Sequence, residues 1–122
     1  VMVQEYLPNV SAGDTRVHVV GGEVIGALLR VPQDADFRGN IHAGGKAVEA
    51  DLSGELLRRA EIVAATLTAK GIFFAGLDFI DGKLSEVNTT SPGVIRETNA
   101  VSGDRLEVKI FDILEKHVRV RD

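Results

Sequence analysis

Short apolar runs separated by turn residues fill the first third of the chain, a pattern that predicts β-strands. The first run covers residues 1–7 and ends at Pro8. The next two, residues 16–20 and 23–31, flank the pair Gly21-Gly22. A Gly-Gly pair in that setting indicates a hairpin, because both residues can adopt positive φ angles. We therefore predict a strand at the start of the chain, followed by a two-stranded hairpin.

The segment from residue 31 to residue 46 has neither the period of a strand nor that of a helix. It contains Pro32 and three glycines. Structureless segments of this length are uncommon inside a compact domain and are usually either a lid or a disordered segment. We predict a loop over residues 31–46, which we interpret as a mobile lid, and then a short strand at 47–51.

Helical periodicity is clearest over residues 53–70. One stripe of this segment is apolar and consists of Leu56, Ala60, Val63, Ala64 and Leu67. Ser53 is predicted to cap the first turn through its side chain. Gly71 is predicted to end the helix in a left-handed conformation.

Two more helices are predicted near the end of the chain. A short one opens at Ser91-Pro92-Gly93 and reaches about Asn99. A longer one covers about 104–118, where Asp104 and Glu107 form a capping-box pattern. Its apolar stripe is predicted to consist of Leu106, Ile110, Leu114 and Val118.

A second hairpin is predicted between these helical segments. Residues 72–80 are apolar on both faces, which indicates a central strand. Asp81-Gly82 then turns the chain into a return strand at 84–89. The elements together predict an α+β fold, with an antiparallel-rich sheet and helices packed on one side.

Asp78, Glu86 and Asn88 lie on this second hairpin and are the strongest candidates for chemistry. Asp78 stands inside the most apolar stretch of the chain, where an unpaired carboxylate would be costly. A loop with an odd number of residues would place residues 78, 84, 86 and 88 on one face, whereas a two-residue turn would separate Asp78 from the others. Converging oxygens would suit Mg²⁺. The alternative is a solvated return strand, with Asp78 satisfied by a backbone amide or an arginine.

Three arginines could bind carboxylate or phosphate: Arg16, Arg30 and Arg38. For Arg16 and Arg38 taken singly, a solvated surface charge is the simpler interpretation. Arg30 ends an apolar strand and is harder to explain in that way. The run Gly44-Gly45-Lys46 could cradle a phosphate, although the pattern alone favours a plain turn.

Composition and charge exclude several classes of protein. The 122 residues carry a net charge of −4, which argues against a general binder of nucleic acid or anionic membranes. The chain has no cysteine, which excludes disulfides and thiolate metal sites. It has no apolar run of membrane-spanning length and opens without a signal-peptide pattern. Because the first residue is Val1, we expect a fragment of a longer protein.

Two long runs of the sequence resemble prokaryotic glutathione synthetase, a member of the ATP-grasp superfamily. They are VQEYLPNVSAGDTRVHVVGGEVIGALLRVPQDADFRGNIHAGGKA and GIFFAGLDFIDGKLSEVNTTSPGVIRE. The resemblance covers the chain from Val1 to about Leu114. It implies that residues 1–122 are the C-terminal ATP-grasp subdomain, without the N-terminal substrate domain and the first half of the ATP-grasp fold.

The resemblance also implies an activity and its cofactors. The activity is ATP- and Mg²⁺-dependent ligation of γ-glutamylcysteine to glycine through an acyl phosphate, with Mn²⁺ as another usable metal. We expect a cytoplasmic enzyme that is a homo-oligomer at full length and has no nucleic-acid or membrane partner. The isolated fragment is expected to be inactive. Alternatives are another ATP-grasp carboxylate–amine ligase, or a non-catalytic binding module that keeps the fold.

Site residues follow from the same resemblance. The implied metal ligands are Asp78, Glu86 and Asn88. The implied nucleotide-binding residues are Gln4, Glu5, Tyr6, Leu7, Asp14 and Asn88. Arg30 and Arg38 are implied to act in catalysis at the transferred phosphate. The implied substrate-binding residues are Arg16, Arg30, Asn40, Gly44, Gly45 and Ser91.

Overall fold

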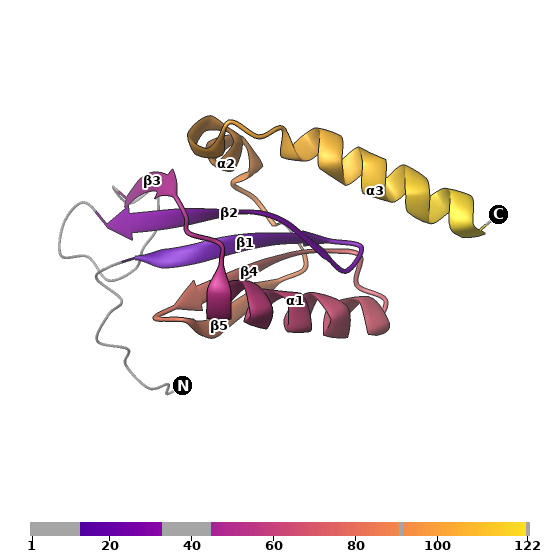
Figure 1. Cartoon of the computed structure of the whole chain (residues 1–122), viewed down its shortest axis with the longest axis horizontal. Helices are drawn as coiled ribbons and strands as arrows, with labels where there is room; N and C mark the ends of the chain where they lie inside the picture. The colour runs from indigo at the N-terminus through magenta and orange to yellow at the C-terminus, as the bar shows by residue number, and fades with distance from the viewer. Residues whose placement is uncertain (1–12, 33–44, 91, 122) are drawn as a thin grey trace.

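The computed structural model describes residues 13–32, 45–90 and 92–121. These residues form a five-stranded sheet of order β3-β2-β1-β4-β5, in which all neighbouring strands are antiparallel (Figure 1). The strands are β1 (Asp14–Val20), β2 (Glu23–Pro32), β3 (Gly45–Glu49), β4 (Phe74–Ile80) and β5 (Lys83–Asn88). The helices are α1 (Gly54–Ala69), α2 (Ile95–Ser102) and α3 (Leu106–Arg121). The α+β class is confirmed, and the strand predicted at 1–7 lies outside the described residues.

The helices cover both faces of the sheet rather than one. Helix α1 lies on one face, while α2 and α3 lie on the other (Figure 1). The core under α1 contains Val17, Val19, Ala27, Ala60, Ala64, Ala75, Leu77 and Phe79. The smaller core under α2 and α3 contains Val20, Ile25 and Leu106. The prediction of helices on one side was wrong, because the strands carry apolar residues on both faces and both need cover.

Helix α1 is close to its prediction. Its predicted apolar stripe packs into the core, and Gly71 has a φ angle of +83°. Ser53 does precede the first helical residue, but its hydroxyl donates to the Asp51 carboxylate at 2.7 Å, and its oxygen accepts no hydrogen bond from the amides of the first turn. The predicted side-chain cap is therefore wrong.

Helix α3 departs from its prediction at its start and on its buried face. Its first amide, on Leu106, donates to the Asn99 side chain at 2.9 Å, and Asn99 donates to Glu107 at 2.6 Å. The end of α2 therefore caps α3, in place of the predicted Asp104 pairing. A step of four residues also drifts around a helix of 3.6 residues per turn. For this reason Ile113 takes the core position, and Leu114 is exposed.

The first hairpin is confirmed, and both ends of the predicted loop are strand instead. Val20 pairs with Glu23 across Gly21-Gly22, whose φ angles are +57° and +83°. Strand β2 extends to Pro32, and β3 begins at Gly45, which pairs with Pro32. The remainder of the predicted lid lies outside the described residues. None of the described helices has the length and apolarity needed to cross a membrane.

Candidate functional site

The β4–β5 hairpin brings Asp78 and Glu86 directly opposite each other, but not by the predicted route. Ile80 pairs with Lys83, so the turn has only two residues, Asp81 and Gly82, with φ angles of +53° and +74°. The pairing then shifts between Asp78 and Phe79, which leaves Ser85 as the extra residue of a β-bulge.

This bulge restores the face that the two-residue turn would have reversed. Asp78 pairs with Glu86 and Gly76 with Asn88, so both partners share the face of Asp78. Leu84 pairs with Phe79 and therefore lies on the opposite face. The shared face predicted for residues 78, 86 and 88 is confirmed, and its extension to residue 84 is wrong.

Two arginines bind Asp78 from the neighbouring strands. Arg16 stands opposite Asp78 in the sheet, and its Nε and Nη2 donate to the two carboxylate oxygens at 2.5 and 3.1 Å. Arg30 Nη2 lies 3.2 Å from the first of these oxygens. Arg30 also makes two bonds to Asp14, its partner across β1 and β2. Two aspartates and two arginines thus form one network across three strands.

This network, which we call the Asp14–Arg16–Arg30–Asp78 network, is buried and electrically balanced. Arg16 and Asp78 are only 6% and 4% exposed. Burial raises the pKa of Asp14, against the opposing effect of its bonds to Arg30. Burial alone would lower the pKa of Arg30. Its bonds to Asp14, together with the charges of Asp14 and Asp78, outweigh burial and raise that pKa. The interpretation of Arg16 as a solvated surface charge is therefore wrong. The alternative in which an arginine satisfies Asp78 is confirmed.

Glu86 and Asn88 border the network on the edge strand. Glu86 is exposed, and Asn88 is partly buried, with its side-chain oxygen accepting from the Thr90 amide at 3.2 Å. Carboxylate and amide oxygens suit a hard divalent cation, so the chemistry of this donor set fits the implied metal. Within the described residues, no group of three or more His, Cys, Asp or Glu side chains could hold a metal ion. Asp78, Glu86 and Asn88 do not form such a group, because the third of them is an asparagine.

Two neighbours of the network were not predicted as site residues. Gly76 lies under Arg16, where an added Cβ would stand 3.0 Å from Cδ and 3.1 Å from Nε. The sequence does carry a signal for it, since glycine inside a strand often marks a close approach. The other neighbour is His18, which is fully buried, and burial lowers its pKa to about 4.

The hydrogen bonds of His18 define its tautomer. Its Nε2 lies 2.8 Å from Thr98 Oγ1, and that hydroxyl donates its proton to the Val94 carbonyl at 2.7 Å. Nε2 must therefore donate to Thr98, and Nδ1 carries no proton. Nδ1 has no hydrogen-bond partner in the described part of the chain. His18 ties α2 to the sheet next to the network.

The structure places only some of the other predicted site residues. Those outside the described residues are Gln4, Glu5, Tyr6, Leu7, Arg38, Asn40, Gly44 and Ser91. Gly45 and Lys46 are the first residues of β3, so the plain turn favoured for Gly44-Gly45-Lys46 is wrong at these two positions. Lys46 pairs with Val31, which places it on the sheet face opposite Arg30.

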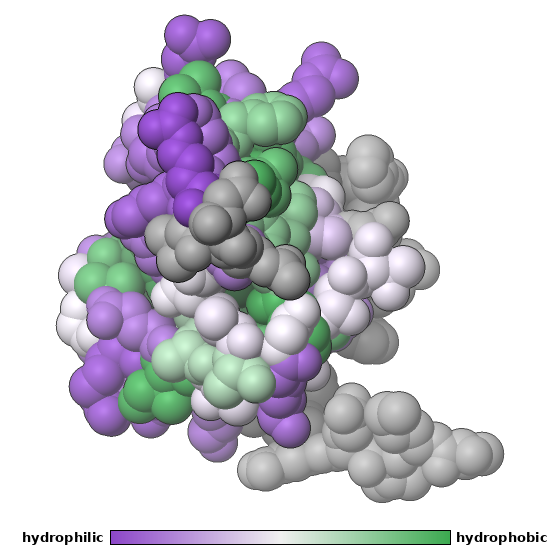
Figure 2. Space-filling model, turned by 90° about the vertical axis from the view of Figure 1, so that its right-hand side faces the viewer, coloured by the Kyte–Doolittle hydropathy of each residue, from purple (hydrophilic) through white to green (hydrophobic). Residues whose placement is uncertain are grey.

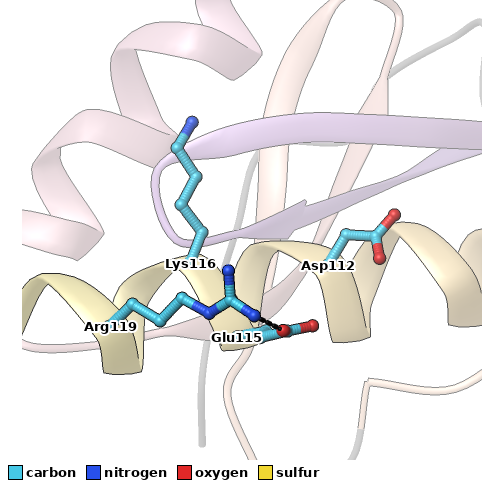
Figure 3. Close-up of a pocket in the computed structure, with 4 residues that line it drawn as sticks. All are labelled: Asp112, Glu115, Lys116 and Arg119. Carbon is cyan, nitrogen blue, oxygen red and sulfur yellow. Dashed lines mark hydrogen bonds and ion pairs between the residues drawn. The ribbon is translucent and has the colours of Figure 1, made fainter.

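A surface hollow on α3 lies apart from these residues in the sequence. It is lined by Asp112, Glu115, Lys116 and Arg119 (Figure 3). Arg119 binds Glu115 one turn away, and Lys116 points away from this pair (Figure 3). All four side chains are charged and come from one helix, so we interpret the hollow as a solvated helix surface.

The whole chain is similar to glutathione synthetases. The family model described as "Prokaryotic glutathione synthetase, ATP-grasp domain" matches residues 1–103. The chain is 40% identical over 116 residues to the glutathione synthetase of Synechocystis sp., covering 95% of this chain and 36% of the relative. It is 43% identical over 119 residues to that of Gloeobacter violaceus, covering 98% and 37%. The chain thus spans little more than a third of these curated relatives.

Solved structures of ATP-grasp ligases share the fold. The ATP-grasp ligase PsnB, solved with a minimal precursor, matches with a TM-score of 0.59 at 21% identity, covering 85% of this chain and 34% of that one. The D-alanine–D-alanine ligase of Bacillus anthracis, solved with ATP, matches with a TM-score of 0.54 at 20% identity, covering 90% and 39%. At these identities the matches show the fold alone.

Proposed function

The chain belongs to the family of prokaryotic glutathione synthetase ATP-grasp domains, and we propose that it is the C-terminal portion of an enzyme that makes glutathione. That enzyme uses ATP to activate the carboxylate of γ-glutamylcysteine as an acyl phosphate, which the amine of glycine then attacks. We also propose that it is cytoplasmic and homo-oligomeric at full length.

The observation that carries this proposal is the position of two arginines beside an acidic hairpin. Arg16 and Arg30 share one sheet face with Asp78, which pairs with Glu86 on the exposed edge strand. Phosphoryl transfer is catalysed mainly by positioning and by neutralising charge, and it needs no protein nucleophile. Guanidinium groups held beside this hairpin by carboxylates would be close to the anionic oxygens of a bound phosphate.

Asp78, Glu86 and Asn88 are the residues that we propose to hold Mg²⁺. When bound, the metal would neutralise the charge of the nucleotide phosphates and orient them. Exposure of Glu86 leaves this side of the sheet edge open to a ligand. The part of the predicted lid between β2 and β3 is proposed to close over the site, with Arg38 acting at the phosphate and Asn40, Gly44, Gly45 and Ser91 near the peptide. Gln4, Glu5, Tyr6, Leu7 and Asp14 are proposed to line the nucleotide pocket.

The shortness of the chain relative to its relatives supports a role as one part of a larger enzyme. Large apolar side chains are exposed on α1, α3 and β5: Ile62, Val108, Phe111, Leu114, Val118, Leu84 and Val87. Figure 2 shows hydrophobic areas interspersed with hydrophilic ones on one face of the molecule. The four on α3 recur at steps of three or four residues and so line one side of the helix, and an exposed apolar stripe of this kind favours a docked portion of protein over a stand-alone binding module.

A chimera tests the proposal directly. This chain would replace the matching segment of the Synechocystis glutathione synthetase, and ADP release would be measured with γ-glutamylcysteine and glycine. We expect ATP- and Mg²⁺-dependent turnover by the chimera and none by the 122-residue chain alone. A folded chimera that releases no ADP would contradict the proposed activity, and turnover by the chain alone would contradict its role as a part.

Ligation of another carboxylate to another amine is the second candidate. The observation that favours it is the shared fold with ligases named for other substrates. A panel of dipeptides and amino acids, offered to the same chimera, separates the two candidates. We expect the highest kcat/KM for γ-glutamylcysteine with glycine, and a better pair would favour the second candidate.

A further inference from the structure

Arginine binds both oxygens of the Asp78 carboxylate. Both of its oxygens accept from Arg16, at 2.5 and 3.1 Å, and Arg30 shares the first oxygen at 3.2 Å. The side chain is also almost completely buried. A hard cation bound by this carboxylate needs at least one of the same oxygens. A cation on these oxygens would lie beside the positive guanidinium of Arg16, and the two charges repel, so the cation and Arg16 compete for the carboxylate.

Gly76 makes the Arg16 position available. A Cβ on Gly76 would come within 3.0 to 3.1 Å of three Arg16 atoms, closer than ordinary van der Waals contact. Gly76 is not one of the glycines with a positive φ angle, so turn geometry does not account for it. The space above it is what glycine provides here, and the Arg16 guanidinium fills this space.

We propose that Arg16 is a positioning residue that holds the Asp78 carboxylate until a divalent cation displaces it, and that Gly76 provides the room for this resting position. The proposal rests on the metal role proposed above for Asp78. When the cation displaces Arg16, the free guanidinium can bind a phosphate anion that arrives with the cation. The Arg16–Asp78 pair is thus replaced by two pairs, one between the cation and Asp78 and one between Arg16 and the anion. A cation alone then binds weakly, because it must leave Arg16 without a partner, whereas a cation with a phosphate anion binds well.

A purely structural role for Arg16 predicts something different. If Arg16 only balanced a buried charge, a replacement that keeps the positive charge, such as Arg16→Lys, would leave the binding of a cation unchanged. The exchange proposed here predicts that loss of the paired bonds to Asp78 strengthens the binding of a bare cation even when the charge is kept. Affinity for the metal alone therefore separates the two roles, independently of any enzyme activity.

The experiment is a titration of the 122-residue chain with Mn²⁺ alone, in which free Mn²⁺ is followed by electron paramagnetic resonance. We expect Arg16→Gln to bind Mn²⁺ about tenfold more tightly than the unaltered chain, since one charged competitor is removed. Arg58→Gln is the matched control, because Arg58 is an exposed arginine paired with Glu55 on α1. It changes the net charge equally and should leave the affinity unchanged.

Two further variants keep the proposal testable if Arg16→Gln does not fold. Arg16→Lys keeps the charge but cannot bond both oxygens in the same way, and Gly76→Ala presses on the guanidinium. Each should tighten Mn²⁺ binding by about threefold or more, as expected for weakening one charge-assisted bond. Unfolding midpoints measured on the same samples show which variants are folded. Unchanged or weaker Mn²⁺ affinity in the folded variants would overturn the proposal.

Glu86→Gln separates this failure from a failure of the proposed metal site. If Mn²⁺ binding weakens in Glu86→Gln while the Arg16 variants show no gain, the metal site stands and the exchange is wrong. If Glu86→Gln and the Arg16 variants all leave Mn²⁺ binding unchanged, Mn²⁺ does not bind at this hairpin and the proposed metal site is wrong as well.

Discussion

The two hairpins of the sheet have the same backbone plan and opposite surroundings. In both, a two-residue turn with positive φ angles is followed by a bulge at the third residue of the second strand, Ile25 in one and Ser85 in the other. The residue opposite the end of the bulge is titratable in both, His18 in the first hairpin and Asp78 in the second. Because β1 and β4 are antiparallel, the turns point to opposite ends of the sheet.

The surroundings differ in what covers this titratable residue. Thr98 of α2 binds His18, and Leu106 of α3 lies over Gly26, the partner of His18 in the sheet. Asp78 is bound instead by arginines of the sheet itself, and its partner Glu86 is exposed on the edge strand. The first hairpin is thus closed by helices, whereas the second keeps charged groups at an open edge.

The two hairpins also differ in whether they place like charges opposite each other. Two carboxylates directly opposite each other on neighbouring strands repel. The first hairpin has glycine opposite its histidine, while the second places Glu86 opposite Asp78. Stability of the fold alone does not explain an acidic residue at position 86. The pair is therefore the better marker of function, and the predictions below test the comparison.

The largest effect is expected from removing the carboxylate of Asp78. Asp78→Ala leaves the buried guanidinium of Arg16 without its partner and removes one partner of Arg30. Loss of one member of a buried ion pair costs about 3 to 5 kcal/mol. We expect the free energy of unfolding in urea to fall by that amount.

Glu86→Ala is the matched control for this loss. It also removes an acid from the same cross-strand pair, but Glu86 is exposed. The free energy of unfolding should change by no more than about 0.5 kcal/mol. Equal losses in the two variants would show that Glu86 is as structural as Asp78, and the contrast within the second hairpin would disappear.

The titratable residue of the first hairpin should make stability depend on pH. Burial lowers the pKa of His18 from 6.5 to about 4. As the pH falls below 6.5, the unfolded chain takes up a proton that the folded chain does not, so folding weakens until the pH reaches about 4. The total loss over this window is about 3 kcal/mol.

His18→Gln isolates that contribution. Glutamine keeps an N–H donor for Thr98 but does not titrate. Unfolding in urea would be measured between pH 7 and pH 4 for both chains. The difference in free energy between them should shrink as the pH falls, while effects of groups present in both chains cancel. A constant difference would mean that His18 is not held neutral.

A smaller effect compares the two turns. Gly21→Ala introduces a Cβ at a φ angle of +57° and 2.8 Å from Cγ2 of Ile113, so strain and overpacking add. Gly82→Ala has a similar φ angle, but its nearest neighbour is Arg59 Nη1 at 3.7 Å. We expect the free energy of unfolding to fall by about 2 to 4 kcal/mol in Gly21→Ala and by about 1 to 2 kcal/mol in Gly82→Ala. A greater loss for Gly82→Ala would contradict the view that helices cover the first hairpin and that the second lies at an open edge.

Local features of the sequence predicted much of the fold. Gly21-Gly22 and Asp81-Gly82 marked both hairpins because their turn chemistry is contained in the residues themselves. The core stripe of α1 followed from helical spacing for the same reason. The layering did not follow, since no local pattern says which face of a sheet a helix covers. The capping of α3 by Asn99 likewise depends on how two helices meet.

The site was predicted in composition more than in arrangement. The shared face of Asp78, Glu86 and Asn88 was among the predicted alternatives, but the bulge at Ser85 that produces it was not. Sequence separation explains the missing pairings: Arg16 and Asp78 are 62 residues apart and meet only because β1 pairs with β4. The need for glycine at position 76 arises from the same side chain, because Arg16 lies against it. That need could not be predicted before the pairing of the strands was known.

The smallest effect concerns the bulge itself and asks whether backbone or side chain creates it. Ser85 Oγ donates to the Asp78 carbonyl at 3.0 Å, whereas Ile25, at the same place in the first hairpin, has no side-chain donor and still bulges. The bulge therefore belongs to the hairpin plan. Ser85→Ala should lower the unfolding free energy by about 0.5 to 1.5 kcal/mol, as expected for one hydrogen bond. Nuclear Overhauser contacts between strands should still pair Asp78 with Glu86. A shifted register would mean that the serine sets the shared face, because a slip of one residue would turn Glu86 away from Asp78.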